Sequence, residues 1–221
     1  MRYALPYDLP DDRLEPNRVI SHTPTVMPVE EELRHPPRER LLEAARELFY
    51  AEGVHRVGID RLIERADVAK ASLYSTFGSK DGLVKAYLEE YHDRVISRRR
   101  AAAEAESDPV AAILAVFDSL AHDYQRPDYN GCAFSGARAE EPAGGPVDAA
   151  ARAYRAEMRD IFRELCVRAG ATDPDLLAWQ LQLIYSGGAE SAKIERNAEV
   201  AVAQRAAVET LLHSALRSAT P

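Results

Sequence analysis

The sequence has little cysteine and no long hydrophobic run. Its 221 residues include only two cysteines, Cys132 and Cys166, which are too few for a disulfide framework and lack the spacing of a zinc site. No run approaches the roughly 18 apolar residues of a membrane span, and the N-terminus has no apolar stretch of signal-peptide length. We therefore expect a protein of the reducing cytoplasm with no membrane partner.

Catalytic and metal-binding motifs are also missing. The chain has no phosphate-binding loop, nucleophile elbow, HExxH helix or paired-carboxylate motif. Its six histidines include His92, His122 and His213, which lie far apart and have no histidine four residues away, so neither a metal nor another cofactor is predicted. An α-helical enzyme that uses Cys132 with a histidine and a carboxylate stays open as an alternative to the favoured non-enzyme.

Residues 1–37 differ in composition from the rest of the chain. They contain seven of the thirteen prolines, and their apolar residues follow no period. Proline at this density prevents helices and weakens strands, so we predict a disordered, proline-rich leader. Met27 is a possible alternative start. The acidic residues of this segment argue against a DNA-binding arm.

From residue 38 onward, apolar residues recur at helical spacing. No stretch alternates apolar and polar residues for long, so an all-α fold without strands is expected. Aspartate followed by proline marks two helix starts, at Asp108-Pro109 and Asp173-Pro174. Helices are predicted at about 38–52, 59–65, 70–77, from 80 after a Ser79 cap, from 109, at 147–169, from 174 and around 208–216, with a loop or short helix within 125–146.

The two short helices 59–65 and 70–77 are separated by a turn of only about three residues. Such a turn makes the helices cross steeply, as in a helix-turn-helix. The turn needs a residue that tolerates positive φ, and Asp67 can supply it. Apolar side chains are spaced to be buried between the helices: Leu62, Val68, Leu73 and Phe77.

The second of these helices leaves small and hydrogen-bonding side chains exposed. Small residues allow close approach to base edges, hydroxyls can reach phosphates or bases, and lysine can reach guanine or phosphate. The whole chain carries a net charge of −8, but residues 34–85 contain ten Lys or Arg against eight Asp or Glu. This segment is therefore locally positive by 2, and the remainder carries −10. The charge distribution is compatible with a DNA partner.

Residues 38–88 resemble the N-terminal domain of the TetR family of transcriptional regulators. The match includes LLEAARELFYAEG and VGIDRLIERADVAKASLYSTFGSKDGLV, and ASLYSTFGSKDGL is its most specific part. The resemblance implies about nine helices, of which the first three bind DNA and the rest bind a small-molecule effector and dimerise. It implies a homodimeric repressor that the effector releases from an inverted-repeat operator. Carried over by position, the DNA-contacting residues are Gly58, Lys70, Ala71, Ser72, Tyr74, Ser75, Thr76 and Lys80.

Three positions depart from the pattern of that family. Gly58 stands where threonine is frequent, Asp67 replaces the usual turn glycine, and Thr76 replaces a frequent histidine or tyrosine. These departures affect individual contacts and leave the docking mode unchanged. The expected organisation is a leader (1–37), a helix-turn-helix domain (38–83) and an effector-binding and dimerisation domain (84–221).

The C-terminal half specifies less. The segment NGCAFSGARAE resembles one found in a subgroup of the family, and an effector cavity should be mostly apolar with a few polar anchors. For each single candidate, ordinary core packing is the favoured alternative; the candidate lining residues are Phe117, Tyr124, Cys132, Phe134, Met158, Phe162, Trp179 and Tyr185.

Two further functional interpretations concern this half. Cys132 is a candidate thiol sensor if nearby cations lower its pKa, with Arg138 the only cation close in sequence; a buried, inert thiol is the alternative. Small residues on the last two helices would permit close pairing across a two-fold axis: Gly187, Gly188, Ala192, Ala201, Ala203 and Ala207. A ligand-binding module without DNA binding remains a competing function.

Overall fold

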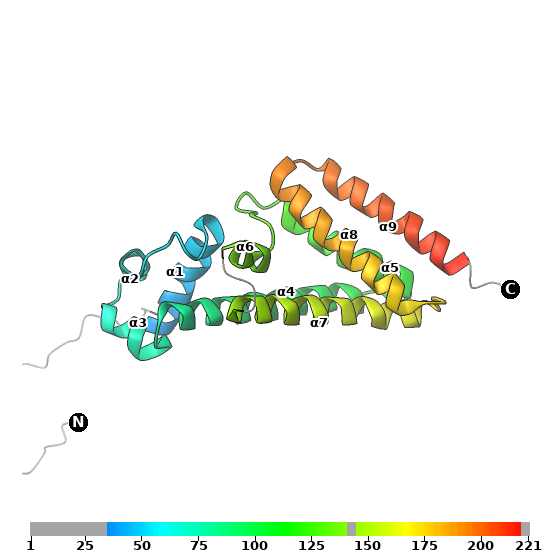
Figure 1. Ribbon diagram of the computed structural model, residues 1–221. Coiled ribbons are helices and arrows are strands. Elements are labelled where there is room, and N and C mark those ends of the chain that lie inside the picture. The colour runs from blue at the N-terminus through cyan, green and yellow to red at the C-terminus, as the bar shows by residue number, and fades with distance from the viewer. Residues whose placement is uncertain (1–34, 141–144, 218–221) are drawn as a thin grey trace, which may run out of the picture. The chain divides into compact units, whose positions relative to one another are not determined.

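The structure of the protein is a computed structural model that describes residues 35–140 and 145–217. All of these residues belong to one compact unit. Almost all of the predicted leader, including Met27, lies outside the described residues. Those residues form nine α-helices and no strand, which confirms the predicted all-α fold (Figure 1).

Helices α1, α2, α3 and α7 agree with the predicted boundaries to within about two residues, whereas α9 begins nine residues before the predicted start at 208. The turn between the two short N-terminal helices and the short helix within 125–146 are both present. The elements are α1 (Pro37–Glu52), α2 (Ile59–Ala66), α3 (Lys70–Phe77), α4 (Lys80–Glu104), α5 (Pro109–Tyr124), α6 (Ala133–Ala139), α7 (Pro146–Arg168), α8 (Pro174–Glu195) and α9 (Glu199–Arg217).

Side-chain caps fix the starts of three helices. The Ser79 hydroxyl accepts a hydrogen bond from the Gly82 backbone N–H at 3.0 Å, and so begins α4. Asp108 and Asp173 accept from the backbone three residues on, at 2.8 and 2.9 Å. In both cases a proline follows at the first helical position, where its missing N–H costs nothing.

The first three helices pack around a small core that continues onto α4. Leu41, Leu62 and Leu73 are completely buried, one from each helix. The Phe49 ring of α1 meets the Tyr87 ring of α4 edge to face, with centroids 5.6 Å apart. The start of α4 therefore holds the three-helix unit against the rest of the fold.

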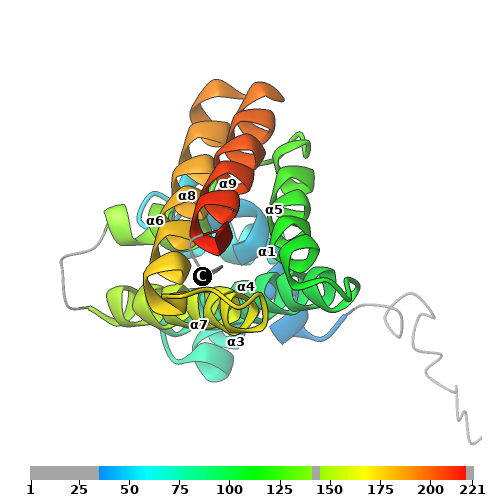
Figure 2. The ribbon, with the colours of Figure 1, turned by 90° about the vertical axis from the view of Figure 1, so that its right-hand side faces the viewer.

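The remaining helices enclose a second part of the core. Phe117, Phe162 and Tyr185, from α5, α7 and α8, form an aromatic cluster with centroids 5.4–6.0 Å apart. Helices α8 and α9 pack side by side, as Figure 2 shows, and α8 also packs on α7. None of the described helices combines the length and the apolar character that crossing a membrane requires.

A buried ionic network joins α4, α5 and α8. The Arg99 guanidinium, 1% exposed, donates to Asp123 Oδ2 at 2.5 Å, to Ser119 Oγ at 2.7 Å and to the Tyr185 hydroxyl at 3.0 Å. Burial by itself lowers the pKa of Arg99, but the interactions with Tyr185 and Asp123 outweigh it and raise that pKa. Arg99 therefore stays charged inside the core.

Candidate DNA interface and effector cavity

The turn between α2 and α3 has the left-handed conformation that the sequence predicts. Asp67 adopts φ 51° and ψ 54°, and its N–H donates to Glu64 O at 3.1 Å. The Val68 N–H closes the turn by donating to Ile63 O at 3.1 Å. The Arg40 side chain of α1 donates to the Asp67 carbonyl oxygen at 2.6 Å, and so holds the turn against α1. The sequence did not predict this role for Arg40.

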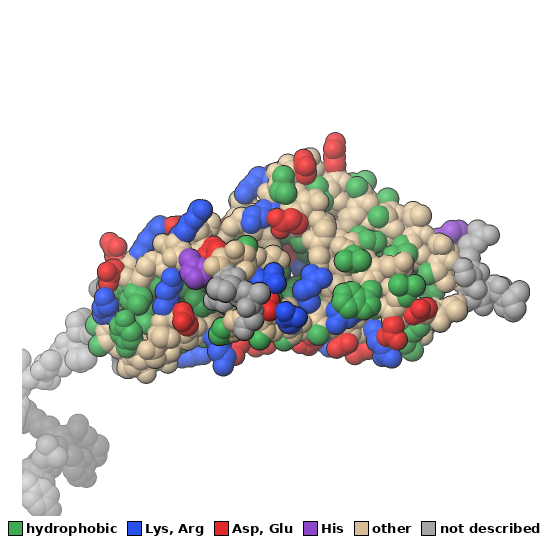
Figure 3. Space-filling model, viewed as in Figure 1, with side chains coloured by type: hydrophobic (Ala, Val, Ile, Leu, Met, Phe, Trp, Pro, Cys, Tyr) green, Lys and Arg blue, Asp and Glu red, His purple; other side chains and the backbone are tan. Residues whose placement is uncertain are grey.

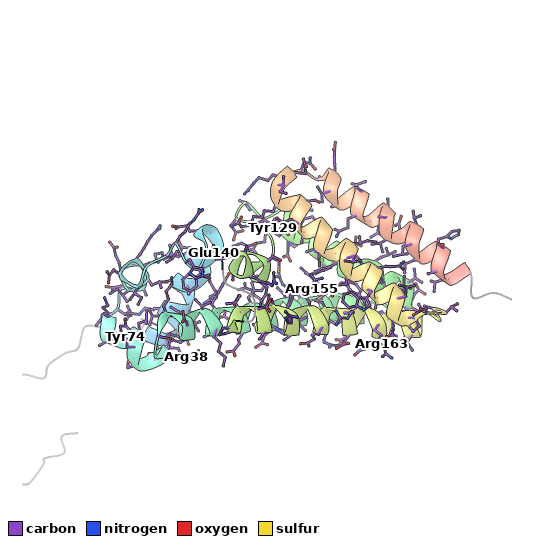
Figure 4. The ribbon with its side chains drawn as sticks, in the orientation of Figure 1. Arg38, Tyr74, Tyr129, Glu140, Arg155 and Arg163 are labelled. Carbon is purple, nitrogen blue, oxygen red and sulfur yellow. The ribbon has the colours of Figure 1, made fainter. Side chains whose placement is uncertain are left out.

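Helix α3 presents most of the expected side chains to solvent. Tyr74 is 45% exposed and stands out as a large ring on an otherwise small-residue surface (Figure 4). Leu73 faces the core, and Phe77 is half-buried beneath the Arg38 guanidinium, which lies 6.0 Å from its ring centroid. Of the residues carried over from the family, Lys70, Ala71, Tyr74, Ser75 and Thr76 are exposed, Ser72 and Lys80 are partly exposed, and Gly58 is exposed ahead of α2.

Much of the positive charge of this region is paired with carboxylates. Lys70 Nζ lies 3.1 Å from Asp60 Oδ1, and this hydrogen bond raises the pKa of Lys70. Arg61 and Arg65 of α2 pair with Glu52 and Glu47 of α1. The local excess of positive charge is therefore small, and the Asp60 carboxylate offsets the charge that Lys70 offers to a phosphate.

The junction of α3 and α4 is a second candidate contact for DNA. The first N–H groups of α4 point out of its N-terminus, and Lys80 adds a positive charge there. A helix N-terminus with a lysine is suited to a phosphate. The junction is tightly packed, because a Cβ atom built on Gly82 would lie 2.0 Å from the Phe77 carbonyl oxygen.

We expect Gly82→Ala to lower the free energy of unfolding by about 1–3 kcal/mol, because the added methyl group collides with backbone and not with a flexible side chain. Chemical denaturation monitored by circular dichroism measures this change. Gly136→Ala in α6 is the matched control, since a Cβ there meets nothing within 4 Å. The control should stabilise by about 0.4–1 kcal/mol; equal effects at both positions would contradict the packing argument.

A cavity of about 480 Å³ lies between α6, α7 and α8. Three of the eight predicted effector residues line it: Cys132, Phe134 and Tyr185. The cavity is also lined by Tyr154, Arg155 and Ser186, which were not predicted. These residues lie on the sides of α7 and α8 that face α6. Which side of a helix faces another helix is known only once the fold is known.

The other five predicted effector residues do not line this cavity. Phe117, Met158 and Phe162 are at most 2% exposed and pack in the core between helices. Tyr124 borders a different hollow, beside the start of α9. Trp179 is 47% exposed on the outer side of α8, where the Arg159 guanidinium lies 4.1 Å from its ring centroid.

Cys132 does not have the surroundings of a sensor thiol. Burial raises the pKa of this thiol, and hydrogen bonds to nearby backbone only partly oppose that rise. The predicted cation Arg138 is held by Asp148, at 2.5 Å from Nε to Oδ1; the cation that acts on the thiol is Arg155. Burial also raises the pKa of Cys166, to about 12. Raised pKa values disfavour the reactive thiolate, so the inert interpretation is preferred.

Helix α6 is tied to the three-helix unit at both of its ends. At one end, the Tyr50 hydroxyl donates to Gly131 O at 3.0 Å and accepts from the Asn130 N–H at 2.9 Å. At the other, Glu140 accepts from the His55 backbone N–H at 2.7 Å (Figure 4). A shift of α6 would therefore also displace α1 and the loop that leads to α2.

Metal binding has no candidate site in the part of the chain that the structure describes. Within residues 35–140 and 145–217, no three His, Cys, Asp or Glu side chains lie together in a way that could hold a metal ion.

Comparison with known proteins finds one family. The family model for bacterial regulatory proteins of the tetR family matches residues 41–87. The HTH-type transcriptional activator FasR of Mycolicibacterium smegmatis is 39% identical over 92 residues, which cover 40% of this chain and 42% of FasR. The HTH-type transcriptional repressor ComR of Escherichia coli is 29% identical over 92 residues. The chain spans less than half the length of these curated relatives.

Solved structures match over a larger share of the chain. SCO4454, a TetR-family transcriptional regulator from Streptomyces coelicolor, is 33% identical with a TM-score of 0.77, covering 81% of this chain and 96% of that one. A cysteine mutant of CifR, solved with a 26 bp double-strand operator DNA, is 25% identical with a TM-score of 0.69, covering 80% of this chain and 95% of that one.

Proposed function

Because the chain belongs to the TetR family of transcriptional regulators, we propose that it is a cytoplasmic repressor that binds an inverted-repeat DNA operator as a homodimer. The exposed face of α3 around Tyr74, followed by the capped N-terminus of α4, carries the proposal. Two such faces about 34 Å apart would enter successive major grooves on one side of the duplex. The named relatives act in both directions, since FasR is an activator and ComR a repressor. A reporter gene placed behind the DNA upstream of the protein's own gene distinguishes repression from activation. If the protein is a repressor, deleting its gene should raise reporter expression.

We assign the DNA-contacting roles to the residues carried over from the family. Tyr74 would reach bases or phosphates from the middle of α3, with Ala71 and Ser75 beside it. Lys80 and the first N–H groups of α4 would hold a phosphate and set the orientation. The remaining contacts are assigned to Gly58, Lys70, Ser72 and Thr76.

We expect Tyr74→Ala to weaken operator binding by about ten- to a hundredfold, the range of one lost base contact. Electrophoretic mobility shift with the DNA upstream of the protein's own gene measures the affinity. Lys80→Ala should weaken binding to all sequences and reduce the salt dependence of log K by about 0.9, one phosphate contact. Lys85→Ala is the matched control, because Lys85 lies on the same helix but pairs with Glu89 at 3.7 Å. Unchanged affinity in both Tyr74→Ala and Lys80→Ala would count against the docking mode.

A small-molecule effector bound in the cavity between α6, α7 and α8 would control this activity. The cavity touches α6, and α6 is bonded to α1 and to the α1–α2 loop through Tyr50 and Glu140. A ligand that favours one position of α6 would shift the population towards a spacing of the two recognition helices that no longer fits the operator.

The homodimer is proposed from the outer face of α8. Large apolar side chains lie exposed there in one line, at spacings of three, four and eleven residues, and Figure 3 shows hydrophobic side chains over that helix. A line of this kind on a helix is suited to pairing with a second helix. Its members are Leu176, Trp179, Leu183 and Ile194, with exposed Gly187 between the last two.

Not all of the small residues predicted for dimerisation lie on that face. Gly188 and Ala192 are buried against the chain's own α9, and a Cβ on Gly188 would lie 2.0 Å from the Gln204 side chain. Gly187, Ala203 and Ala207 are exposed and remain in the proposed interface, while Ala201 is only partly exposed.

A further inference from the structure

Arg155 brings a positive charge into the cavity between α6, α7 and α8 without a carboxylate to balance it. Its Nη1 donates to the Ser186 hydroxyl at 2.9 Å, and Figure 4 labels its side chain between α6 and α8. Among the described residues, no carboxylate forms an ion pair with Arg155, although Asp148 and Glu190 also line the cavity. A half-buried guanidinium is strongly stabilised by an anion, so this charge is available to a ligand.

The other two arginines of the cavity differ from Arg155, because both are already bound to a carboxylate. The Asp148 carboxylate, 3% exposed, receives Arg138 Nε at 2.5 Å on one oxygen and Arg152 Nη2 at 2.9 Å on the other. One carboxylate thus binds two guanidinium groups. Glu190 of α8 is the second carboxylate that lines the cavity. The three arginines and two carboxylates of the lining therefore sum to one positive charge.

A second hydrogen-bond donor stands beside Arg155. The Ser186 oxygen accepts from Arg155 Nη1 and, at 3.4 Å, from Gln182 Nε2. Since these contacts use the oxygen as an acceptor, the Ser186 hydroxyl also has its own proton to donate. Arg155 and Ser186 together offer a charged and a neutral donor to one ligand group.

The rest of the cavity lining includes aromatic side chains. Phe134 and Tyr154, whose rings are stacked on each other with centroids 4.7 Å apart, line it together with Tyr185 and Ala189. A planar ring system can pack against such aromatic side chains. The volume of about 480 Å³ is in the range of sites that enclose a small organic molecule.

The geometry points to an aromatic carboxylic acid as the class of effector, with its carboxylate on Arg155 and Ser186 and its ring against Phe134 and Tyr154. This inference rests on the proposed effector site and adds the chemistry of its ligand. The planar guanidinium matches a carboxylate with two parallel hydrogen bonds, which an uncharged amide cannot reproduce.

The test compares 2-naphthoate with 2-naphthamide, which has nearly the same shape and no charge. Isothermal titration calorimetry on the full chain should give a Kd for 2-naphthoate at least about tenfold lower, since hydrogen bonds to charged groups are the stronger ones. Equal affinities, or no binding of either compound at millimolar concentration, would overturn the inference.

Variants of two arginines on α7 locate the effect. Arg155→Met should abolish the preference for the acid, whereas Arg155→Lys, which retains the charge, should keep most of it. Arg152→Met is the matched control, because Arg152 lines the same cavity but is bound to Asp148; its preference should be unchanged. If Arg155→Met fails to fold, the Arg155→Lys variant and the Arg152→Met control still test the inference. Loss of the preference for 2-naphthoate in Arg152→Met would show that the carboxylate does not bind at Arg155.

Mobility shift without any added compound separates this inference from the proposed function. A protein that retards its operator DNA but shows no preference for 2-naphthoate would refute only the ligand class. A protein that prefers 2-naphthoate through Arg155 but binds no DNA would refute only the regulator.

Discussion

Replacing Arg99 by methionine is expected to lower the free energy of unfolding by about 3–5 kcal/mol, the range for breaking a buried ion pair by removing one partner. The substitution leaves Asp123, 6% exposed, without its buried counter-ion. It also removes the two hydrogen bonds that Arg99 donates to the hydroxyl oxygens of Ser119 and Tyr185. Methionine fills much of the arginine volume, so the loss measures the charge and the hydrogen bonds more than a void. Urea denaturation followed by circular dichroism gives the value.

Arg98→Met is the matched control for this variant. Arg98 is the preceding residue and also binds Asp123, at 2.7 Å, but its side chain is 40% exposed. An ion pair with one solvated partner contributes only about 0–1 kcal/mol. In addition, Arg98 Nε is buried without a hydrogen-bond partner, so its removal relieves an unfavourable group. Similar losses for the two variants would show that the network does not depend on the buried guanidinium.

A double variant separates the effect of the unpaired charge from the effect of the lost hydrogen-bond geometry. Arg99→Met combined with Asp123→Asn removes the uncompensated charge that the single variant leaves behind. Unpaired buried charge is the main cost of breaking such a pair, so the double variant should be more stable than Arg99→Met alone. A double variant that is less stable would indicate that the hydrogen-bond geometry, and not the charge, dominates the network.

The sequence predicted those parts of the fold that depend on neighbouring residues. The Ser79 cap, the two aspartate-proline starts and the positive φ of Asp67 each depend on only a few consecutive residues. Helical periodicity gave the buried stripes for the same reason. The partners of Arg99 could not be predicted, because they lie 20, 24 and 86 residues away. Pairing over such distances is decided by how the helices pack.

The candidate sites were predictable to different extents. The DNA-facing residues share one short helix, so a local pattern placed them together. The effector cavity is made by three helices, and local patterns do not say which side of each helix faces it. Trp179 shows the difficulty: α8 has apolar residues on both its buried and its exposed sides, so an aromatic residue on it can be assigned to either.

The outer face of α8 gives the second large expected effect. Leu183, 62% exposed, lies in the middle of the apolar line formed with Trp179 and Ile194. If that line is the contact between two copies, Leu183→Glu places two like charges in an interface without partners, and each charge must be desolvated. Light scattering at micromolar concentration should then give the 24.5 kDa of one chain, where the wild type gives twice that mass.

Operator binding by Leu183→Glu should fall by about 10²–10⁴-fold, because two recognition helices on separate chains no longer bind as one unit. The change should cost the isolated chain little stability, since exposed side chains contribute within about 0.5 kcal/mol. Val167→Glu is the matched control: Val167 is 53% exposed on α7, is not a member of the apolar line of α8, and receives the same charge. A Leu183→Glu protein that stays dimeric and retains its operator affinity would exclude this face as the contact, and the spacing argument for an inverted repeat would then need another two-fold axis.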